Sequence, residues 1–410
     1  MILRVPYYYK EFQCIAGACK DSCCIGWEID IDEDTFAYYQ ELEGEFGDRL
    51  RASMAAGEDN TFVLKKGRCP FLNEANLCDI CLELGEEALC QVCTEYPRFV
   101  IEYGDVTEKS LALSCEVVGQ LVFGRREPIY VEEILQDDYF ADEEEAGRER
   151  ANEEEGEEGE EGEEDQEDFS FAPFIEKARD LAISLIQDRR LPIEERICRM
   201  LFFARDFQEQ INEEDESGME AVLHRWNQAD AAPEGDCYDG LAGERSVEGN
   251  RMETFRLFVQ RLAFFKKMEV LDKEWEEASA QVEETIKQAG QEGYFTLRRQ
   301  FMDSLRRQDR EYEYEHLCVY FLFRYIMQAV YDSNFFGHGA AAAACFLMIR
   351  DMDMVRFHRQ GGVFSLEDRI DVARIFSKEV EHSEENLEYL LDGVYYEEFM
   401  TLENLIRQVV

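Results

Sequence analysis

Cysteines are the residues whose type and spacing most directly suggest chemistry in this chain. Ten of the fourteen lie within the first 115 residues, at Cys14, Cys19, Cys23, Cys24, Cys69, Cys78, Cys81, Cys90, Cys93 and Cys115. Two pairs, Cys78/Cys81 and Cys90/Cys93, are each separated by two residues. Such a gap places both sulfur atoms on one turn, and a second pair completes a four-thiolate shell. Thiolates favour zinc, iron–sulfur clusters and Cu(I), so we expect metal to organise this region.

The spacing is compatible with more than one kind of centre. Four thiolates around zinc make a closed structural site, whereas the same ligands can hold an iron–sulfur cluster. The cysteines outnumber one such site, so two centres, or one centre with free thiols, are both possible. Tyr96-Pro97-Arg98 follows Cys93 closely and puts a permanent cation near anionic thiolates. The alternative interpretation of this tripeptide is a surface turn.

The net charge of −49 restricts the possible partners. The Glu/Gly-rich stretch 142–168 carries −15, and subtracting it still leaves −34 for the rest of the chain. Such a surface repels nucleic acid and attracts basic or lysine-bearing proteins. High solubility is the alternative explanation. The stretch cannot bury enough apolar surface to offset its ordering entropy, so we expect a disordered acidic linker over residues 141–168.

No signal peptide or membrane span is recognisable in the sequence. The start lacks a basic stretch followed by an apolar run, and the most apolar windows are too short or too interrupted to cross a bilayer. We therefore expect a cytoplasmic protein without membrane contact. Thiols stay reduced there, which favours metal binding over disulfides.

Hydrophobic periodicity predicts a mainly α protein. Residues 1–140 are expected to form a small cysteine-rich α+β metal-binding domain, with strands at 27–32, 99–103 and 111–113 and a helix at 117–123. Asp32 or Asp34 is expected to cap a helix over 35–39, and Gly104-Asp105 to form a turn. From Pro173 onward apolar residues recur every three or four positions, so residues 169–410 are expected to be all-helical. All five histidines lie in that half without metal-ligand spacing, which suggests surface or helix-cap positions.

Several motifs resemble the flagellin lysine-N-methylases. They are Cys19-x3-Cys23-Cys24-x-Gly26-Trp27-x-Ile29-x-Ile31-Asp32, Cys69-x-Phe71-Leu72-x4-Leu77-Cys78-x-Ile80, Leu84-Gly85-Glu86-x2-Leu89-Cys90-x2-Cys93-x2-Tyr96-Pro97-Arg98, Leu113-Ser114-Cys115-Glu116 and Val319-Tyr320-Phe321-Leu322-Phe323-Arg324-Tyr325. The amino-terminal region also resembles small cysteine-rich proteins described as zinc or iron chelators. The Glu/Gly tract departs from the family pattern, as does Glu116, where a proline is expected.

The resemblance implies a protein-lysine methyltransferase of the bacterial flagellum that uses S-adenosylmethionine, contains a 4Fe-4S cluster and acts on flagellin. It implies metal ligands at Cys14, Cys19, Cys23, Cys24, Cys69, Cys78, Cys90, Cys93 and Cys115, and leaves Cys81 out. Tyr96 and Arg98 are the expected cofactor-binding residues. No catalytic residue is singled out, because many tyrosines and carboxylates could take the lysine proton. The alternatives are a non-enzymatic zinc- or iron-binding protein with a structural metal site, and a redox or metal-delivery protein.

Overall fold

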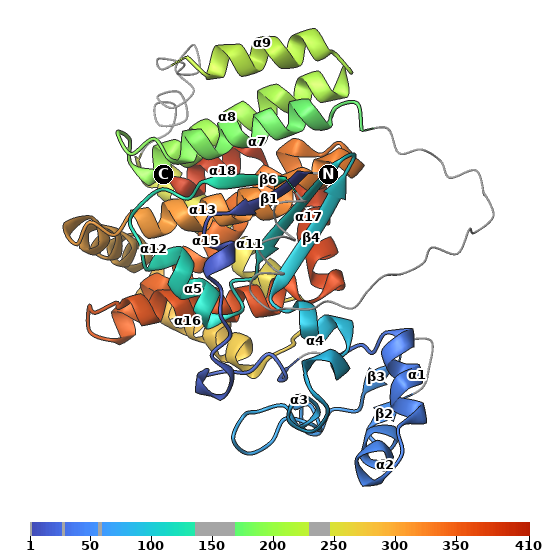
Figure 1. The fold of residues 1–410 in the computed structure, drawn as a ribbon. Coiled ribbons are helices and arrows are strands. Elements are labelled where there is room, and N and C mark those ends of the chain that lie inside the picture. The colour runs from blue at the N-terminus through green and yellow to red at the C-terminus, as the bar shows by residue number, and fades with distance from the viewer. Residues whose placement is uncertain (1, 27–28, 56–59, 136–168, 229–246) are drawn as a thin grey trace.

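The chain folds around two hydrophobic cores of unequal size. The structure, a computed structural model, describes residues 2–26, 29–55, 60–135, 169–228 and 247–410. One core lies among residues 29–90 and forms what we call the small lobe, which projects from the larger main body (Figure 1). The second core joins the remaining amino-terminal strands to the carboxyl-terminal helices. The predicted linker at 141–168 falls outside the described residues, and the predicted domain boundaries stay a prediction.

The small lobe is built from short elements around Tyr39, Phe62 and Phe71. Its helices are α1 (Glu33–Glu41), α2 (Glu45–Arg51), α3 (Asp79–Leu84) and α4 (Gln91–Glu95), and β2 (Met54–Ala55) pairs with β3 (Thr61–Phe62). Asp32 caps α1 by accepting a hydrogen bond from the Thr35 amide at 2.9 Å, as predicted. Its other oxygen accepts from the Gln91 amide at 2.8 Å, which fixes the start of α4 beside the start of α1.

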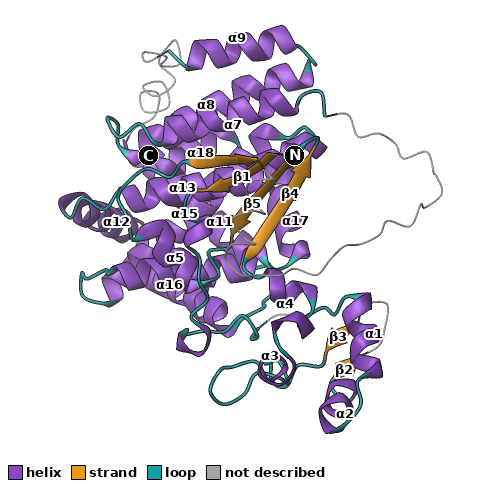
Figure 2. Ribbon diagram, in the orientation of Figure 1, coloured by secondary structure: helices purple, strands orange, loops and turns teal. Residues whose placement is uncertain are grey.

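A four-stranded sheet lies in the main body, in the order β4-β5-β1-β6. Strand β1 (Ile2–Pro6) pairs in parallel with β5 (Val106–Leu111) and antiparallel with β6 (Val131–Leu135), and β4 (Arg98–Tyr103) pairs antiparallel with β5. Helix α5 (Glu116–Phe123) follows and packs against α16 (Leu366–Glu381). Figure 2 shows this sheet set among the helices of the main body.

The carboxyl-terminal helices enclose α15 (Phe335–Arg359), which is buried along most of its length. The others are α7 (Ala172–Ile186), α8 (Ile193–Asn212), α9 (Glu216–Trp226), α11 (Val247–Phe265), α12 (Lys273–Arg307), α13 (Tyr312–Tyr325), α14 (Ala329–Asp332), α16 (Leu366–Glu381), α17 (Glu384–Tyr396) and α18 (Leu402–Val409). The alanine run 340–344 lets neighbouring helices approach α15 closely. Within the described residues no helix has the length and apolarity to span a bilayer.

The predicted fold class is confirmed, with three local differences. Strand β4, the Gly104-Asp105 turn and helix α5 lie where expected, but the second strand is β5 at 106–111 rather than 111–113. Strands β1 and β6 were not predicted. Residues 27–28 lie outside the described residues, and the rest of the predicted strand at 27–32 contains only an isolated bridge at Asp30.

Candidate metal centre

Four candidate ligands gather where the cysteine-rich segment meets the main body. We call Cys14, Cys19, Cys23 and Cys115 the first thiol group. Burial, followed by negative charge on Cys14 and Cys23, raises the pKa of the Cys115 thiol to about 11. Burial and then the charges of Glu116, Cys115, Cys14 and Cys23 raise the pKa of Cys19 to about 12. The thiols of this group are thus close enough for the charge of one to raise the pKa of another.

Five further candidates gather at the edge of the small lobe. This second thiol group consists of Cys24, Cys69, Cys78, Cys90 and Cys93. Burial and nearby Cys78 and Cys90 raise the pKa of Cys69 to about 11. The Sγ atoms of Cys90 and Cys93 are 3.3 Å apart, and their hydrogen bond lowers the pKa of Cys90 while it raises that of Cys93. Negative charge on Cys24 and Cys69 also raises the pKa of Cys93.

Three of the thiols occupy helix N-caps. Cys78, Cys90 and Cys115 directly precede α3, α4 and α5. Backbone amides of the first helical turn act to lower the pKa of two of these thiols, those of Ile80 and Cys81 for Cys78 and those of Val117 and Val118 for Cys115, but burial outweighs them. Helix N-termini favour anions, so these positions offset part of the cost of burying a thiolate, the form in which cysteine binds metal.

The thiols fit a metal centre in number and chemistry, although they are loosely spaced. Each group contains at least the four thiolates that one zinc ion or one cluster takes. Among the described residues, no three cysteine Sγ atoms lie within 4.8 Å of one another. Sulfur atoms around one tetrahedral zinc lie about 3.8 Å apart, as follows from a Zn–S distance of about 2.3 Å. Cys81, which the resemblance omits, lies near Cys78 and within electrostatic reach of Cys14.

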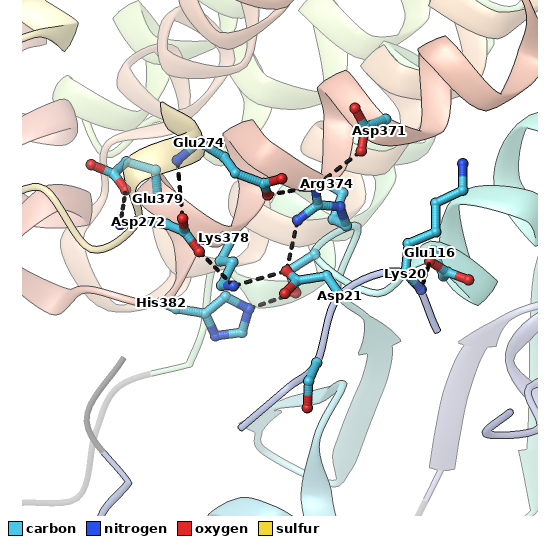
Figure 3. Close-up of polar contacts among 12 residues, drawn as sticks. Lys20, Asp21, Glu116, Asp272, Glu274, Asp371, Arg374, Lys378, Glu379 and His382 are labelled. Atoms are coloured by element: carbon cyan, nitrogen blue, oxygen red, sulfur yellow. Dashed lines mark hydrogen bonds and ion pairs between the residues drawn. The ribbon is translucent and has the colours of Figure 1, made fainter. Parts of the chain in front are cut away.

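A buried ionic network fastens the Cys19–Cys23 loop to helix α16, and we call it the latch. Asp21 Oδ2 accepts from Arg374 at 2.7 Å and from Lys378 Nζ at 2.8 Å (Figure 3). Lys378 also contacts Asp272 at 2.8 Å, and Arg374 contacts Glu274 at 2.6 Å. The three carboxylates converge closely, and the two cations, 6% and 4% exposed, occupy the space between them.

A second connection joins α16 to the segment that carries Cys115. His382, the C-cap residue of α16, contacts Ser114 Oγ through Nε2 at 2.6 Å, and Ser114 contacts the Tyr96 hydroxyl at 3.1 Å. Burial, together with the charges of Arg324 and Lys378, lowers the pKa of His382 to about 3. The imidazole is therefore neutral but is a weak base, which does not suit it to take a proton from lysine.

The two predicted cofactor-binding residues differ in their surroundings. Tyr96 lies beside the first thiol group, and burial followed by the charge of Cys115 raises the pKa of its hydroxyl well above the usual value. Arg98, the first residue of β4, stacks over the Phe12 ring with its guanidinium carbon 5.4 Å from the ring centre. The role of both residues in cofactor binding stays a prediction.

Sequence reasoning missed the latch and part of the histidine environment. Asp21 and Lys378 are 357 residues apart, so no local spacing could indicate their contact. The cap position predicted for histidines holds for His382, but His316 and His338 are fully buried rather than exposed. His316 is anchored by the Val122 carbonyl at 2.7 Å and His338 by Asp332 at 2.9 Å.

Comparison with known proteins identifies the helical part of the chain. Residues 179–408 match the model of the FliB lysine N-methylase C-terminal domain. A lysine-N-methylase of Salmonella choleraesuis is 31% identical over 127 residues, which cover 28% of this chain and only 30% of that protein. The flagellar biosynthetic protein FliU of Salmonella muenchen is also 31% identical over 127 residues, covering 72% of its length. No solved structure matches significantly. Because the family model covers more than half of the chain, this protein belongs to the FliB lysine N-methylase family.

Proposed function

We propose that this chain transfers methyl groups from S-adenosylmethionine to lysine side chains of flagellin, with a 4Fe-4S cluster bound by its amino-terminal thiols. The observation that carries the proposal is the gathering of nine candidate thiol ligands into two groups, in a chain whose helical part matches a lysine N-methylase domain. We place the reaction in the bacterial cytoplasm. The relative named for flagellar biosynthesis supports a flagellar substrate.

The proposed reaction requires lysine as a neutral amine. Its nitrogen lone pair attacks the methyl carbon, a nitrogen–carbon bond forms, and the carbon–sulfur bond breaks to release S-adenosylhomocysteine. Free lysine has a pKa of about 10.4, so the proton must leave before or during attack. The acidic surface would raise the local concentration of a lysine-bearing protein but would also hold the amine in its charged form. The reacting atoms should therefore meet in a drier and less acidic place than the surface.

The chain's own residues would hold and shield the centre. The first thiol group includes both ends of the loop that the latch holds and lies beside Tyr96, and the second lies against the core of the small lobe. A bound cluster would supply an anionic, redox-active centre close to both lobes. Helix N-caps at Cys78, Cys90 and Cys115 would offset part of its negative charge.

The experiment is methyl transfer by protein purified without oxygen. Unmethylated flagellin, S-adenosylmethionine and the full chain are combined, and the intact mass of flagellin is followed together with the iron and zinc content of the enzyme. Flagellin should gain mass in whole methyl increments. Iron-containing, brown protein that leaves flagellin unchanged would refute the transfer. Colourless protein with stoichiometric zinc and no transfer would establish the structural-metal alternative.

A further inference from the structure

A cavity separate from the thiol groups lies between the sheet and the helices of the main body. Its volume is about 340 Å³, within the range of ligand pockets. The lining comes from β1, β6, α7 and α13 and from the segments beside these strands. Tyr8, Tyr130, Tyr320 and Phe323 supply aromatic surface, and Ile183 adds aliphatic surface.

Carboxylates outnumber cations at this cavity. Arg4 lines it, is only 5% exposed, and contacts Glu133 and Glu176 at 2.9 Å each. It also approaches Glu108 at 3.6 Å and Asp180 at 3.8 Å. Within the part of the chain that the structure describes, the other cation paired with this set is the buried Arg179, which contacts Glu108 and Asp180. Two arginines thus face four carboxylates in this network, and the three members that line the cavity, Arg4, Glu133 and Asp180, have a formal net charge of −1.

The surplus charge is at the rim, where a partner can reach it. The side chains of Glu133 and Asp180 are 61% and 51% exposed, and Tyr130, which stacks on Tyr7, is 58% exposed. Much of the floor is apolar, and the Tyr320 hydroxyl there donates to Glu381 and accepts from the Leu113 amide. A ligand that fits combines an apolar stem with a cationic end, because aromatic rings and carboxylates both favour a cation.

We infer that this cavity binds a lysine side chain of the protein substrate in its charged form. This inference rests on the proposed function, because that function is the reason for choosing lysine among the possible cationic ligands. The net negative charge of the lining stabilises an ammonium and raises its pKa, so the cavity is suited to recognition and not to methyl transfer. The recognised lysine is held here while transfer takes place elsewhere on the chain. Loss of this contact should therefore raise the KM for flagellin and leave kcat unchanged.

The test measures binding without methyl transfer. A short fluorescein-labelled peptide with one lysine among alanine and threonine is compared with its norleucine counterpart, which keeps the stem and lacks the charge. The variant is the double substitution Glu133→Gln with Asp180→Asn, at two exposed rim positions. The matched control is Glu388→Gln with Asp392→Asn, which makes the same charge change on exposed positions of α17.

The lysine peptide should bind the native chain more tightly than the norleucine peptide. The rim variant should weaken lysine binding about five- to tenfold, while the control and the norleucine peptide stay unchanged. Equal weakening by both variants would attribute binding to general surface acidity and overturn the inference. Loss of S-adenosylhomocysteine binding by the rim variant, with lysine binding retained, would make the cavity an adenosyl site and also overturn it.

Kinetics separate this inference from the proposed function. If the rim variant methylates flagellin with an unchanged KM, the cavity does not bind the substrate lysine, whereas the proposed methyltransferase function stands. A fall in kcat without a change in KM would place transfer inside the cavity, against the inference. Selective lysine binding by a chain that transfers no methyl group would support the cavity and refute the methyltransferase.

Discussion

Substitution of Asp21 by asparagine should release the Cys19–Cys23 loop from α16. Asp21 makes two charge-assisted contacts, at 2.7 Å to Arg374 and 2.8 Å to Lys378, from a side chain that is 20% exposed. Hydrogen bonds to charged groups are each worth about 1.5–3 kcal/mol. Asparagine keeps one acceptor oxygen, and both cations keep another carboxylate, so we expect a loss of about 1.5–2 kcal/mol in docking. Because about 1.4 kcal/mol corresponds to a factor of ten, local opening should increase about 10- to 30-fold.

Hydrogen exchange measured by mass spectrometry reports this opening directly. The Lys20 amide donates to Glu116 at 2.9 Å across the junction, so peptides spanning residues 15–25 should exchange about 10- to 30-fold faster. Peptides from the buried alanine run of α15 should keep their protection. Asp309→Asn is the control, because Asp309 pairs with Arg126 at a site where both side chains are more than half exposed.

A double-mutant cycle assigns the effect to the latch itself. Asp21→Asn and Lys378→Met should each increase exchange, and their combination should cost about 1 kcal/mol less than the sum of the two. Exchange that changes less than twofold in Asp21→Asn, or single effects that add fully, would refute the reasoning. In that case the loop would be held by its thiols and not by the ionic network.

Three further predictions concern the centre, the packing and the pH response. Cys90→Ser should remove most of the bound metal by elemental analysis, whereas Cys198→Ser, a buried cysteine of α8 outside both thiol groups, should retain it; equal metal in the two variants would contradict the ligand assignment. Gly119→Ala should lower the free energy of unfolding in urea by about 1–3 kcal/mol, because the added Cβ meets Ile370 Cγ2 at 2.7 Å and separates α5 from α16. Burial raises the pKa of Glu379 to about 7, so the native state binds its proton more tightly than the unfolded state and stability should fall as pH rises from about 4.5 to 7. Glu379→Gln should reduce the loss of unfolding free energy over this pH range by about 1–2 kcal/mol, after discounting for solvent screening. A loss equal to that of the native chain would exclude Glu379 as its source.

The fold class could be predicted from the sequence because the patterns that indicate helices are local. Apolar residues at three- and four-residue steps indicate helices wherever they pack, and Asp32 caps α1 through a contact three residues away. Strands β1 and β6 escaped prediction because each is only five residues long and their partners lie far along the chain, with Ile2 opposite Val106 and Leu135. Pairing of this kind leaves little periodicity within one strand.

The candidate site was predictable only in its residue types. Spacing and the family resemblance indicated a set of candidate ligands, but grouping these cysteines depends on tertiary contacts, such as the approach of Cys115 at the start of α5 to Cys14 and Cys23. No sequence pattern indicated the latch or the contact of His382 with Ser114, because lysine, arginine and histidine on a helix usually face solvent. Only the packing of α16 against α5 brings them to the cysteine-rich segment.

The vicinal pair Cys23-Cys24 links the two thiol groups, and this bears on how a centre could form. Cys23 lies within reach of Cys19 and Cys115, whereas Cys24 lies within reach of Cys93. A hydrogen bond between the two neighbouring thiols is the largest cause of the raised pKa of Cys23. Adjacent residues share one peptide unit, so movement of either thiol toward a metal also moves the other. We therefore expect a backbone movement that brings one thiol group around a metal to shift the second group as well, and the latch at Asp21 acts on the same short loop.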